Sequence, residues 1–437
     1  MVIDEIRNIF DNKRCVILGF GREGKCWLEL LKNAGCCAEI AVADMNPQNI
    51  PGVTGIYGED YLKRAGEYDI ILQSPGVVIK DSYDERTKAK ILTQTELLLR
   101  LKPCRIIGIT GTKGKSTTSS LIHHFLTACG YNSMLIGNIG VPPLARLSEM
   151  NENTVAVCEM GCHQLEFVHH SPDIALLLNI FPEHLDHYVS FDAYSEAKRN
   201  IVRFQKENDI GVVNKELLPV EGKGSIFTSE YVTDGSTSDA DVHTDGRSIY
   251  LFGREIPASD IHTRLRGKHN LYNIAMALAA SVKFGADADK CLASLPDFAG
   301  LEHRLEFVAE INGVEYINDS ISTIPEAAIA AVNAFDKVDC LILGGMDRGI
   351  SYDKLGAFLS GGAVENVILL PDSGKRIGEL ISNAQVHLLY ADDMEQAVAL
   401  AKRYAKKRVL LSPAAASYGF YKNFEERGRH FKALVNE

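Results

Sequence analysis

Short apolar runs recur along the chain, and most of them end in a glycine, a proline or a polar side chain. Runs of this length that are rich in β-branched residues predict buried strands. Longer segments with apolar residues at helical spacing lie between them, so strands and helices alternate. This alternation predicts an α/β fold with parallel sheets covered on both faces. The predicted strands include residues 14–18, 38–43, 69–73, 105–109, 133–136, 154–158, 174–179, 314–317, 340–343, 367–370 and 408–411.

A chain of 437 residues is long enough for two to four domains. Residues 1–103 are predicted to form a small Rossmann-like domain. Residues 104–299 are predicted to form a central domain with a mainly parallel sheet, because the composition changes near residues 296–300. Residues 300–437 form a third predicted domain, again Rossmann-like. Two further expectations are an exposed excursion over the polar stretch 233–245 and a helix over 375–384.

The segment 106–120, IIGITGTKGKSTTSS, has the order of strand, glycine-rich turn and helix. This is the context of a phosphate-binding loop, in which backbone N–H groups hold phosphates, Lys115 neutralises charge and the Ser116 hydroxyl binds Mg²⁺. The glycines are Gly108, Gly111 and Gly114, which departs from the spacing of the ordinary nucleoside-triphosphatase loop. A plain glycine-rich turn with a surface lysine is the alternative, but the flanking strand and helix favour an ATP site.

A second glycine-rich turn, Gly19-Phe20-Gly21-Arg22-Glu23-Gly24, follows the first predicted strand. With a helix, a strand and then Asp44, it matches the dinucleotide-binding fingerprint. Alone it would indicate an NAD-dependent oxidoreductase with Asp44 on a ribose hydroxyl. The same turn holds other diphosphates, so it selects nucleotide-like ligands rather than hydride chemistry.

Further polar residues follow the central strands. Glu159 and His184 come at the ends of two strands of the domain that holds the phosphate loop, where they suit Mg²⁺ or a transferring phosphate, although each alone would also fit a polar surface loop. Lys198 carries a positive charge, which does not suit binding to Mg²⁺. From its residue type alone, Lys198 is expected on a solvated helix face. Asn270 and Asn273 share one face of a helix start, where they either cap the helix or contact an adenine.

Composition narrows the class of protein. The formal net charge of −11 argues against nonspecific binding to nucleic acid or to anionic membranes. The ten cysteines lack a metal-ligand spacing and several lie in apolar runs, which indicates a reducing cytoplasm. No signal peptide or apolar span of about 20 residues is present, so membrane insertion is not expected.

The motifs together resemble the Mur ligases, which are ATP-dependent amide-forming enzymes of peptidoglycan synthesis. The similarity runs in collinear order over essentially the whole chain, and the last motifs resemble the members that couple glutamate to UDP-N-acetylmuramoyl-L-alanine. The motifs are ITGTKGKST (109–117), GNIG (137–140), LNIFPEHLD (178–186), AK (197–198), GKHN (267–270), HR (303–304), NDS (318–320), LGG (343–345), LSPAAAS (411–417) and KNFEERG (422–428).

The resemblance implies an N-terminal UDP-binding domain, a central ATPase domain and a C-terminal domain that brings the amino acid. It also implies that the γ-phosphate of ATP moves to the L-alanyl carboxylate, and that the amine of glutamate attacks the resulting acyl phosphate. The implied ligands are ATP, two Mg²⁺ ions, UDP-N-acetylmuramoyl-L-alanine, glutamate and CO₂, the last as a carbamate on Lys198. A monomer is expected.

The resemblance also implies a role for individual residues. Lys115, Glu159, His184 and Lys198 are the implied catalytic residues; Ser116 and Glu159 would hold one Mg²⁺, and His184 and carbamylated Lys198 the other. The implied ATP contacts are Gly111, Thr112, Lys113, Gly114, Lys115, Ser116, Thr117, Asn270, Asn273, Arg304 and Asp319; the UDP-substrate contacts are Gly19, Phe20, Gly21, Asp44, Ser74 and Asn138; the glutamate contacts are Thr323, Arg348, Ser417 and Phe424.

The chain departs from the family pattern at several positions. Lys113 stands where Asn is usual, and the segment Glu159-Met-Gly-Cys-His-Gln-Leu replaces a more usual pair of serines after the glutamate. Within it, Cys162 and His163 are expected to pack or to touch substrate. Ile321 stands where many relatives have a lysine beside the glutamate carboxylate; Arg348 is expected to take over that contact. D-glutamate is the first expectation, and L-glutamate or another acidic amino acid is the alternative. A nonenzymatic ATP-binding regulator and a folylpolyglutamate synthetase are further alternatives, less consistent with these motifs.

Overall fold

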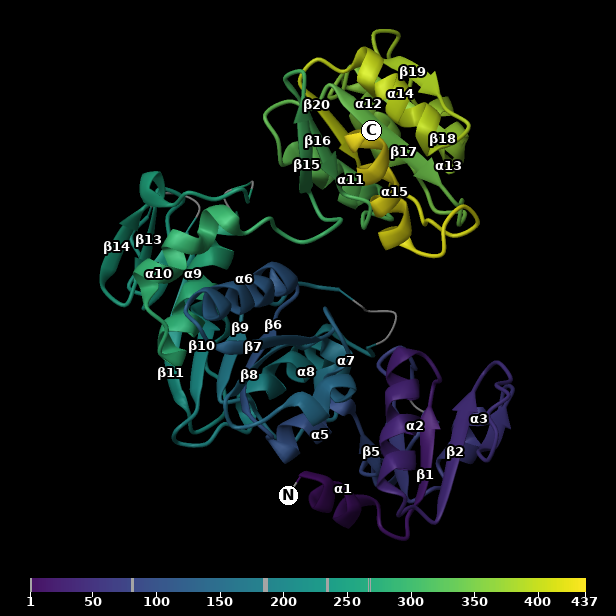
Figure 1. Ribbon diagram of the computed structural model, residues 1–437, viewed down its shortest axis with the longest axis vertical. Helices are drawn as coiled ribbons and strands as arrows, with labels where there is room; N and C mark the ends of the chain where they lie inside the picture. The colour runs from purple at the N-terminus through teal and green to yellow at the C-terminus, as the bar shows by residue number, and fades with distance from the viewer. Residues whose placement is uncertain (1, 80–81, 184–187, 233–235, 266, 268) are drawn as a thin grey trace. The chain divides into compact units, whose positions relative to one another are not determined.

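The computed structural model describes residues 2–79, 82–183, 188–232, 236–265, 267 and 269–437 (Figure 1). The chain divides into two compact units. The first comprises residues 1–262 and 269–295, and the second comprises 263–268 and 296–437. The described residues form three sheets, two in the first unit and one in the second. The three-domain division at residues 103 and 299 stays a prediction.

The first sheet has five parallel strands in the order β3-β2-β1-β4-β5. Its central strand has four fully buried side chains in succession, which is typical of a strand covered on both faces. The fully buried Trp27 of α2 packs against the edge of Phe10 of α1 on one of these faces. The strands are β1 (Arg14–Leu18), β2 (Glu39–Asp44), β3 (Thr54–Tyr57), β4 (Ile70–Gln73) and β5 (Ile91–Leu92).

The second sheet has nine strands in the order β14-β13-β12-β11-β10-β9-β6-β8-β7. The strands from β12 to β7 are parallel, while β13 and β14 add an antiparallel edge. The strands are β6 (Arg105–Thr110), β7 (Asn132–Gly137), β8 (Thr154–Glu159), β9 (Ile174–Leu177), β10 (Ile210–Asn214), β11 (Ser225–Tyr231), β12 (Val242–Thr244), β13 (Ser248–Leu251) and β14 (Arg254–Pro257).

The expectation that residues 233–245 are an exposed excursion is wrong for their end. Val242 and Thr244 of β12 are buried, because the strand pairs with β11 and β13 and turns these alternate side chains inward. Residues 233–235 lie outside the described part of the chain.

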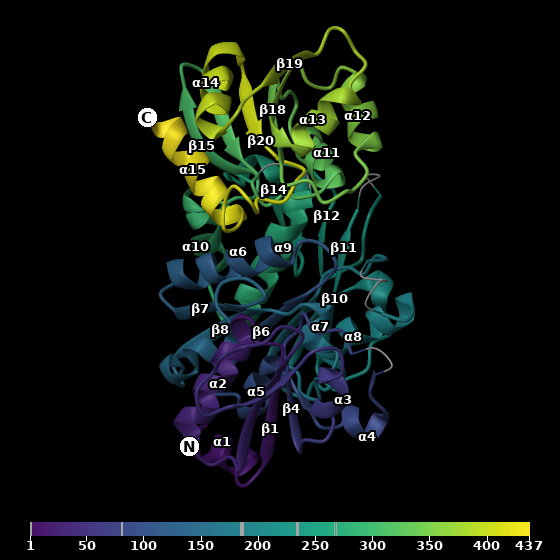
Figure 2. The same cartoon turned by 90° about the vertical axis from the view of Figure 1, so that its right-hand side faces the viewer.

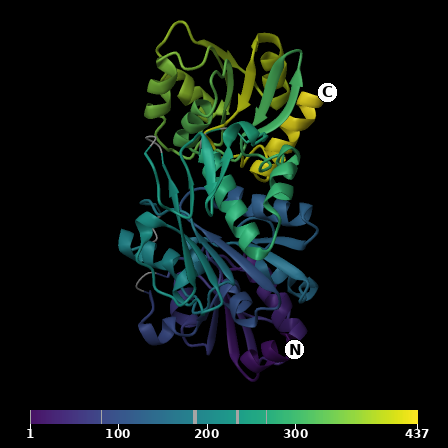
Figure 3. The same ribbon diagram turned by 90° about the vertical axis from the view of Figure 1, so that its left-hand side faces the viewer.

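Helices α6 and α9 of the first unit pack against each other beside the second sheet (Figure 3). Their contact brings Asn273 of α9 close to Gly114, the residue that precedes α6. The helices are α1 (Val2–Phe10), α2 (Arg22–Ala34), α3 (Tyr61–Ala65), α4 (Glu85–Lys88), α5 (Gln94–Leu101), α6 (Lys115–Ala128), α7 (Cys162–Leu165), α8 (Phe191–Arg203), α9 (His269–Phe284) and α10 (Ala288–Ser294), with the 3₁₀ helices η2 (Pro143–Glu149), η3 (Lys215–Leu217), η4 (Ala258–Asp260) and η5 (Leu295–Asp297).

The sheet of the second unit has the strand order β15-β16-β20-β17-β18-β19, parallel except for the pair β15–β16. Helices α11, α12 and α13 cover one face and α14 and α15 the other (Figure 2). The elements are β15 (Glu306–Ile311), β16 (Val314–Asn318), β17 (Cys340–Gly345), β18 (Asn366–Asp372), β19 (His387–Tyr390), β20 (Arg408–Leu411), α11 (Pro325–Asn333), α12 (Asp353–Ser360), α13 (Ser373–Glu379), α14 (Met394–Tyr404) and α15 (Phe424–Asn436).

Helix α13 begins and ends earlier than the predicted helix over 375–384. The Ser382 N–H donates to Ser360 Oγ, and the Asn383 side chain donates to the Ser360 carbonyl oxygen. These bonds tie the segment to the end of α12 instead of continuing the helix. Among the described residues, no helix has the length and apolar character needed to cross a membrane.

Candidate active site

The glycine-rich turn that is predicted to bind phosphate, called the phosphate loop below, lies between β6 and α6, so the predicted order of strand, turn and helix is confirmed. Gly114 precedes the helix with φ of +86°, a left-handed conformation that favours glycine. A Cβ added there would lie 2.5 Å from Oδ1 of Asn273. The site thus requires glycine both for the backbone turn and for the approach of an α9 side chain.

Two lysine amines converge on one carbonyl of this loop. Nζ of Lys115 donates to the oxygens of Gly111 and Thr112, both at 2.9 Å, and Nζ of Lys198 donates to the Gly111 oxygen at 2.8 Å. Lys198 is only 1% exposed, so the residue-based expectation of a solvated helix face is wrong. Burial and then the neighbouring Lys115 lower the pKa of Lys198 to about 8, and burial also lowers the pKa of Lys115.

Glu159, at the end of β8, is buried at 1% exposure. Its Oε1 accepts a hydrogen bond from Nδ2 of Asn138 at 2.8 Å, while its buried Oε2 has no hydrogen-bond partner within the described residues. A buried carboxylate oxygen without a partner is costly, and a cation would satisfy it. His184 lies outside the described residues, and the remaining ones hold no group of three His, Cys, Asp or Glu suited to a metal ion.

Two residues with no assigned role also hold the phosphate loop. Asn179, just beyond β9, accepts from the N–H groups of Thr112 and Lys113 through its carbonyl oxygen and Oδ1, both at 2.8 Å. The hydroxyls of Tyr194 and Thr112 are 2.9 Å apart. The sequence held a signal for each of these contacts. Asn179 lies at the carboxyl edge of the sheet, and Tyr194 lies one helical turn before Lys198.

The two asparagines of α9 lie beside this loop. Nδ2 of Asn273 donates to Oδ1 of Asn270 at 2.8 Å, and Oγ1 of Thr118 lies 3.5 Å from Oδ1 of Asn273. Ser116 and Thr117, in the first turn of α6, are partly exposed. The predicted ATP contacts of the first unit therefore gather around one helix start.

The predicted UDP contacts gather at the carboxyl edge of the first sheet. The Phe20 N–H donates to Oδ2 of Asp44 at 2.9 Å, and the Ser74 hydroxyl donates to the Gly19 oxygen at 2.9 Å. Gly19 has φ of +83°, and Gly21 precedes the first turn of α2. Oδ1 of Asp44 accepts a further backbone N–H, so this carboxylate braces the turn.

This turn also contacts the segments around Glu159 within the first unit. Nη2 of Arg22 donates to the Gly140 oxygen at 3.2 Å, and Nε2 of Gln164 donates to Oε1 of Glu23 at 3.1 Å. Burial raises the pKa of Glu23 to about 7. The glycine turn, the loop that carries Asn138 and the helix after Glu159 are thereby joined.

The predicted glutamate contacts lie on neighbouring loops of the second unit. Nη2 of Arg348 donates to the Thr323 oxygen at 2.8 Å. The Met346 N–H donates to the Ala416 oxygen at 2.9 Å, next to Ser417. The Ser320 hydroxyl donates to the Phe424 oxygen at 2.8 Å. The loops after β16, β17 and β20 are thus tied to each other and to the start of α15.

Asp319, a predicted ATP contact, is 2% exposed in this unit. It accepts bonds from the hydroxyls of Ser322 at 2.6 Å and Ser412 at 2.7 Å, while burial raises its pKa to about 6. Arg304, the other predicted ATP contact here, is exposed.

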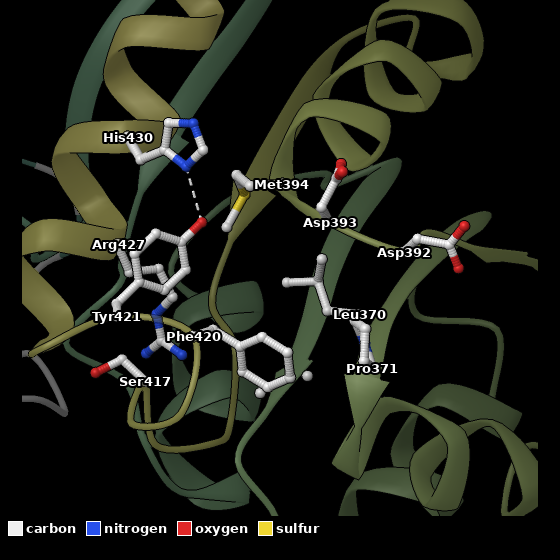
Figure 4. Close-up of a pocket in the computed structure, with 12 residues that line it drawn as sticks. Leu370, Pro371, Asp392, Asp393, Met394, Ser417, Phe420, Tyr421, Arg427 and His430 are labelled. Atoms are coloured by element: carbon white, nitrogen blue, oxygen red, sulfur yellow. Dashed lines mark hydrogen bonds between the residues drawn. The ribbon is translucent and has the colours of Figure 1, made fainter.

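A pocket of about 230 Å³ lies at the carboxyl ends of β17 and β18 in the second unit (Figure 4). The buried Arg427 and the paired Tyr421 and His430, with Oη to Nδ1 at 2.9 Å, form part of its wall. Ser417 also lines it, so the pocket adjoins the predicted glutamate contacts.

Comparisons with known proteins show what this chain is similar to. The Mur ligase middle domain matches residues 109–281, and the Mur ligase glutamate ligase domain matches residues 303–415. The UDP-N-acetylmuramoylalanine--D-glutamate ligase of Clostridium botulinum (strain Langeland) is 34% identical over 410 residues, which cover 88% of this chain and 86% of that protein.

Solved structures share the fold. The UDP-N-acetylmuramate-alanine ligase MurC of Thermotoga maritima matches with a TM-score of 0.60 at 16% identity, over 97% of this chain and 99% of that one. The MurF ligase of T. maritima in complex with ADP matches with a TM-score of 0.56 at 18% identity, over 98% and 96%. The fold is therefore a mixed α/β Mur ligase fold, and the sequence similarity over most of the chain shows that the chain belongs to the Mur ligase family.

Proposed function

We propose that the protein is an ATP-dependent ligase that joins D-glutamate to UDP-N-acetylmuramoyl-L-alanine in cytoplasmic peptidoglycan precursor synthesis. The observation that carries the proposal is the convergence of Lys115, Lys198 and the Asn138–Glu159 pair around the phosphate loop. The name of the Clostridium botulinum relative supports the substrates, and the ADP bound to the MurF ligase of T. maritima supports ATP as the phosphate donor.

We propose that each of the three sheets carries the binding site of a different substrate. The turn at Gly19–Gly24, braced by Asp44 and Ser74, would hold the UDP moiety at residues 1–103. The phosphate loop of residues 104–299 would hold ATP, with Asn270 and Asn273 toward the adenine. Residues 300–437 would bring glutamate through Thr323, Arg348, Ser417 and Phe424, and Arg304 and Asp319 would contact ATP.

The chemistry follows from the weakness of a carboxylate as an electrophile. An oxygen of the L-alanyl carboxylate attacks the γ-phosphorus of ATP, so that ADP leaves and an acyl phosphate forms. The amine of glutamate then attacks the acyl carbon, phosphate leaves, and the ammonium proton is released. Lys115 offsets the charge of the phosphates, while the loop N–H groups and Asn138 hold the reactants in position.

The residues present fit a divalent cation. Ser116 and Glu159 would hold one Mg²⁺, because Oε2 of Glu159 is a buried acceptor with no described partner. His184 and Lys198 would hold a second. Mg²⁺ bound there would neutralise negative charge on the phosphates.

The Lys198 amine is suited to carbamylation by CO₂. A pKa of about 8 leaves part of the amine neutral near neutral pH, and CO₂ reacts with the neutral amine only. The carbamate replaces a cation with a carboxylate-like group, which is the charge that a metal ligand needs.

The choice between D- and L-glutamate rests on the residue at position 321 and its neighbours. An isoleucine cannot pair with a carboxylate, whereas Arg348 is an exposed cation bonded to the Thr323 oxygen. L-glutamate is therefore the second candidate. An NAD-dependent oxidoreductase is less well supported, because it leaves the lysines of the phosphate loop and the buried Glu159 without a role.

Phosphate release by the purified protein tests the proposal. The assay contains ATP, Mg²⁺ and UDP-N-acetylmuramoyl-L-alanine, with D-glutamate and L-glutamate added separately and each substrate omitted in turn. Release that requires D-glutamate is the expected result. Release that requires L-glutamate would keep the mechanism and change the amino acid, and no release with either would contradict the proposed function.

A further inference from the structure

The turn after β17, residues 346–350, carries the exposed Arg348. One N–H of its guanidinium is used on the Thr323 oxygen, at 2.8 Å. A guanidinium has five N–H donors, so the others are available for a carboxylate. The Met346 N–H holds the same turn to the Ala416 oxygen beside Ser417. The turn that carries Arg348 is therefore bonded to the loops that carry two other proposed glutamate contacts, Thr323 and Ser417.

The turn also contains a carboxylate, Asp347, directly before Arg348. A free carboxylate at this place would compete for the Arg348 guanidinium and repel an acidic substrate. Arg376 of α13 engages it instead: Nη1 lies 2.6 Å from Oδ1 and 2.7 Å from Oδ2. This contact, with the Gly349 N–H on Oδ1 at 2.9 Å, holds the pKa of Asp347 below its usual range.

Arg376 holds the far end of the turn as well. Its Nη2 donates to the Ile350 oxygen at 3.2 Å, and its guanidinium lies 5.4 Å from the ring centre of Tyr352. The backbone bends at Gly349, between the two points of contact, where φ is +73°. The Arg376 side chain is 43% exposed, and an ion pair this exposed adds little to the stability of the whole fold. Its effect is local to the turn.

We propose that Arg376 is a positioning residue for the amino-acid substrate. By holding Asp347 it fixes the turn and leaves Arg348 to bind a carboxylate of a dicarboxylic amino acid. The assignment rests on the proposed function, because it concerns the same glutamate subsite.

Steady-state kinetics of R376A, R376K, D347N and the double variant R376A/D347N test the assignment. R376A should raise the KM for glutamate about tenfold, with kcat and the KM for ATP changed less than about twofold. R376K should recover part of the loss, since it keeps the charge without the planar fork. D347N should recover part of it in the R376A background, since the freed carboxylate is then absent.

The matched control is K337A. Lys337 pairs with Glu365 at 2.7 Å and is similarly exposed, but the pair lies at the amino ends of β17 and β18, opposite the turn. K337A should leave the KM for glutamate unchanged, and thermal unfolding should show both variants folded.

The results separate two failures. An unchanged KM for glutamate in R376A, or equal changes in the KM values of all substrates, would overturn the assignment while wild-type turnover upholds the proposed function. A wild-type protein that shows no glutamate-dependent turnover would overturn the proposed function and this assignment with it.

Discussion

The side-chain amide of Asn138 donates a 2.8 Å hydrogen bond to Oε1 of Glu159, which joins the loop after β7 to the end of β8. The bond orients the carboxylate so that one oxygen is satisfied and the other, Oε2, is buried without a described partner. When a side chain orients a carboxylate that binds a metal ion, removing that side chain lowers activity because the carboxylate is no longer held in place.

Replacing Asn138 by Ala should therefore lower kcat/KM by about 10–100-fold, the usual cost of removing such a partner. The assay is phosphate release at several Mg²⁺ concentrations, and the loss should shrink as Mg²⁺ rises. Asn132→Ala is the control, because Asn132 bonds Oγ1 of Thr154 at the other end of the same two strands. Equal losses in the two variants would contradict the role of Asn138.

Replacing Lys115 and replacing Lys113 should have different effects on activity. Lys115→Met should lower kcat by about 10²–10³-fold, because its partly buried amine lies at the loop carbonyls where phosphate charge is expected. Lys113→Met should have a much smaller effect, since Lys113 is 69% exposed and pairs with Glu183 at 2.7 Å. Similar losses in both variants would contradict the placement of the phosphates, and circular dichroism would check that both variants fold.

The buried Lys198 should cost stability in the absence of CO₂ and Mg²⁺. Its pKa falls from 10.5 to about 8, so between these pH values the folded chain binds fewer protons than the unfolded chain. The cost is thus fully present below about pH 8 and is relieved as pH rises toward 10.5.

Lys198→Met should therefore stabilise the protein by roughly 1–3 kcal/mol near neutral pH, after the lost bond to Gly111 is deducted, and should abolish turnover. Urea unfolding of both proteins at about pH 7 and near pH 10 measures the difference. A stability difference that did not decrease with rising pH would refute this account.

Two glycines at opposite ends of α6 separate backbone strain from steric clash. Gly130 has φ of +89° with no atom within 4 Å of an added Cβ, while at Gly114 the Cβ would lie 2.5 Å from Oδ1 of Asn273. Gly130→Ala should cost about 1–2 kcal/mol and leave ATP binding intact. Gly114→Ala should cost more and weaken ATP binding, as measured by calorimetric titration. Equal ATP affinity in the two variants would contradict the packing of α9 against the loop.

Residues at the carboxyl ends of strands were the easiest to predict. Gly19, Asp44 and Ser74 come from three strands far apart in sequence, yet one rule places ligands at the carboxyl edge of a parallel sheet and so brings them together. The residue type of Lys198 did not predict its burial. The buried position depends on the bond to the Gly111 carbonyl, and α8 comes close to Gly111 only in the folded chain.

Predictions also failed where long-range contacts override local pattern. Val242 and Thr244 lie in a polar stretch but pair between two strands, and α13 stops where Ser382 and Asn383 bond the end of α12. The ion pair of Asp347 with Arg376 joins residues 29 positions apart and leaves no periodic signal. Such contacts need the arrangement of the elements before they can be read from the chain.

The transfer of oxygen from the substrate carboxylate to phosphate tests the central claim most directly. UDP-N-acetylmuramoyl-L-alanine labelled with ¹⁸O in its carboxylate is turned over with ATP, Mg²⁺ and D-glutamate, and the released phosphate is analysed by mass spectrometry. An acyl-phosphate route predicts one ¹⁸O in each phosphate released. Unlabelled phosphate accompanied by formation of the amide product would contradict the proposed mechanism.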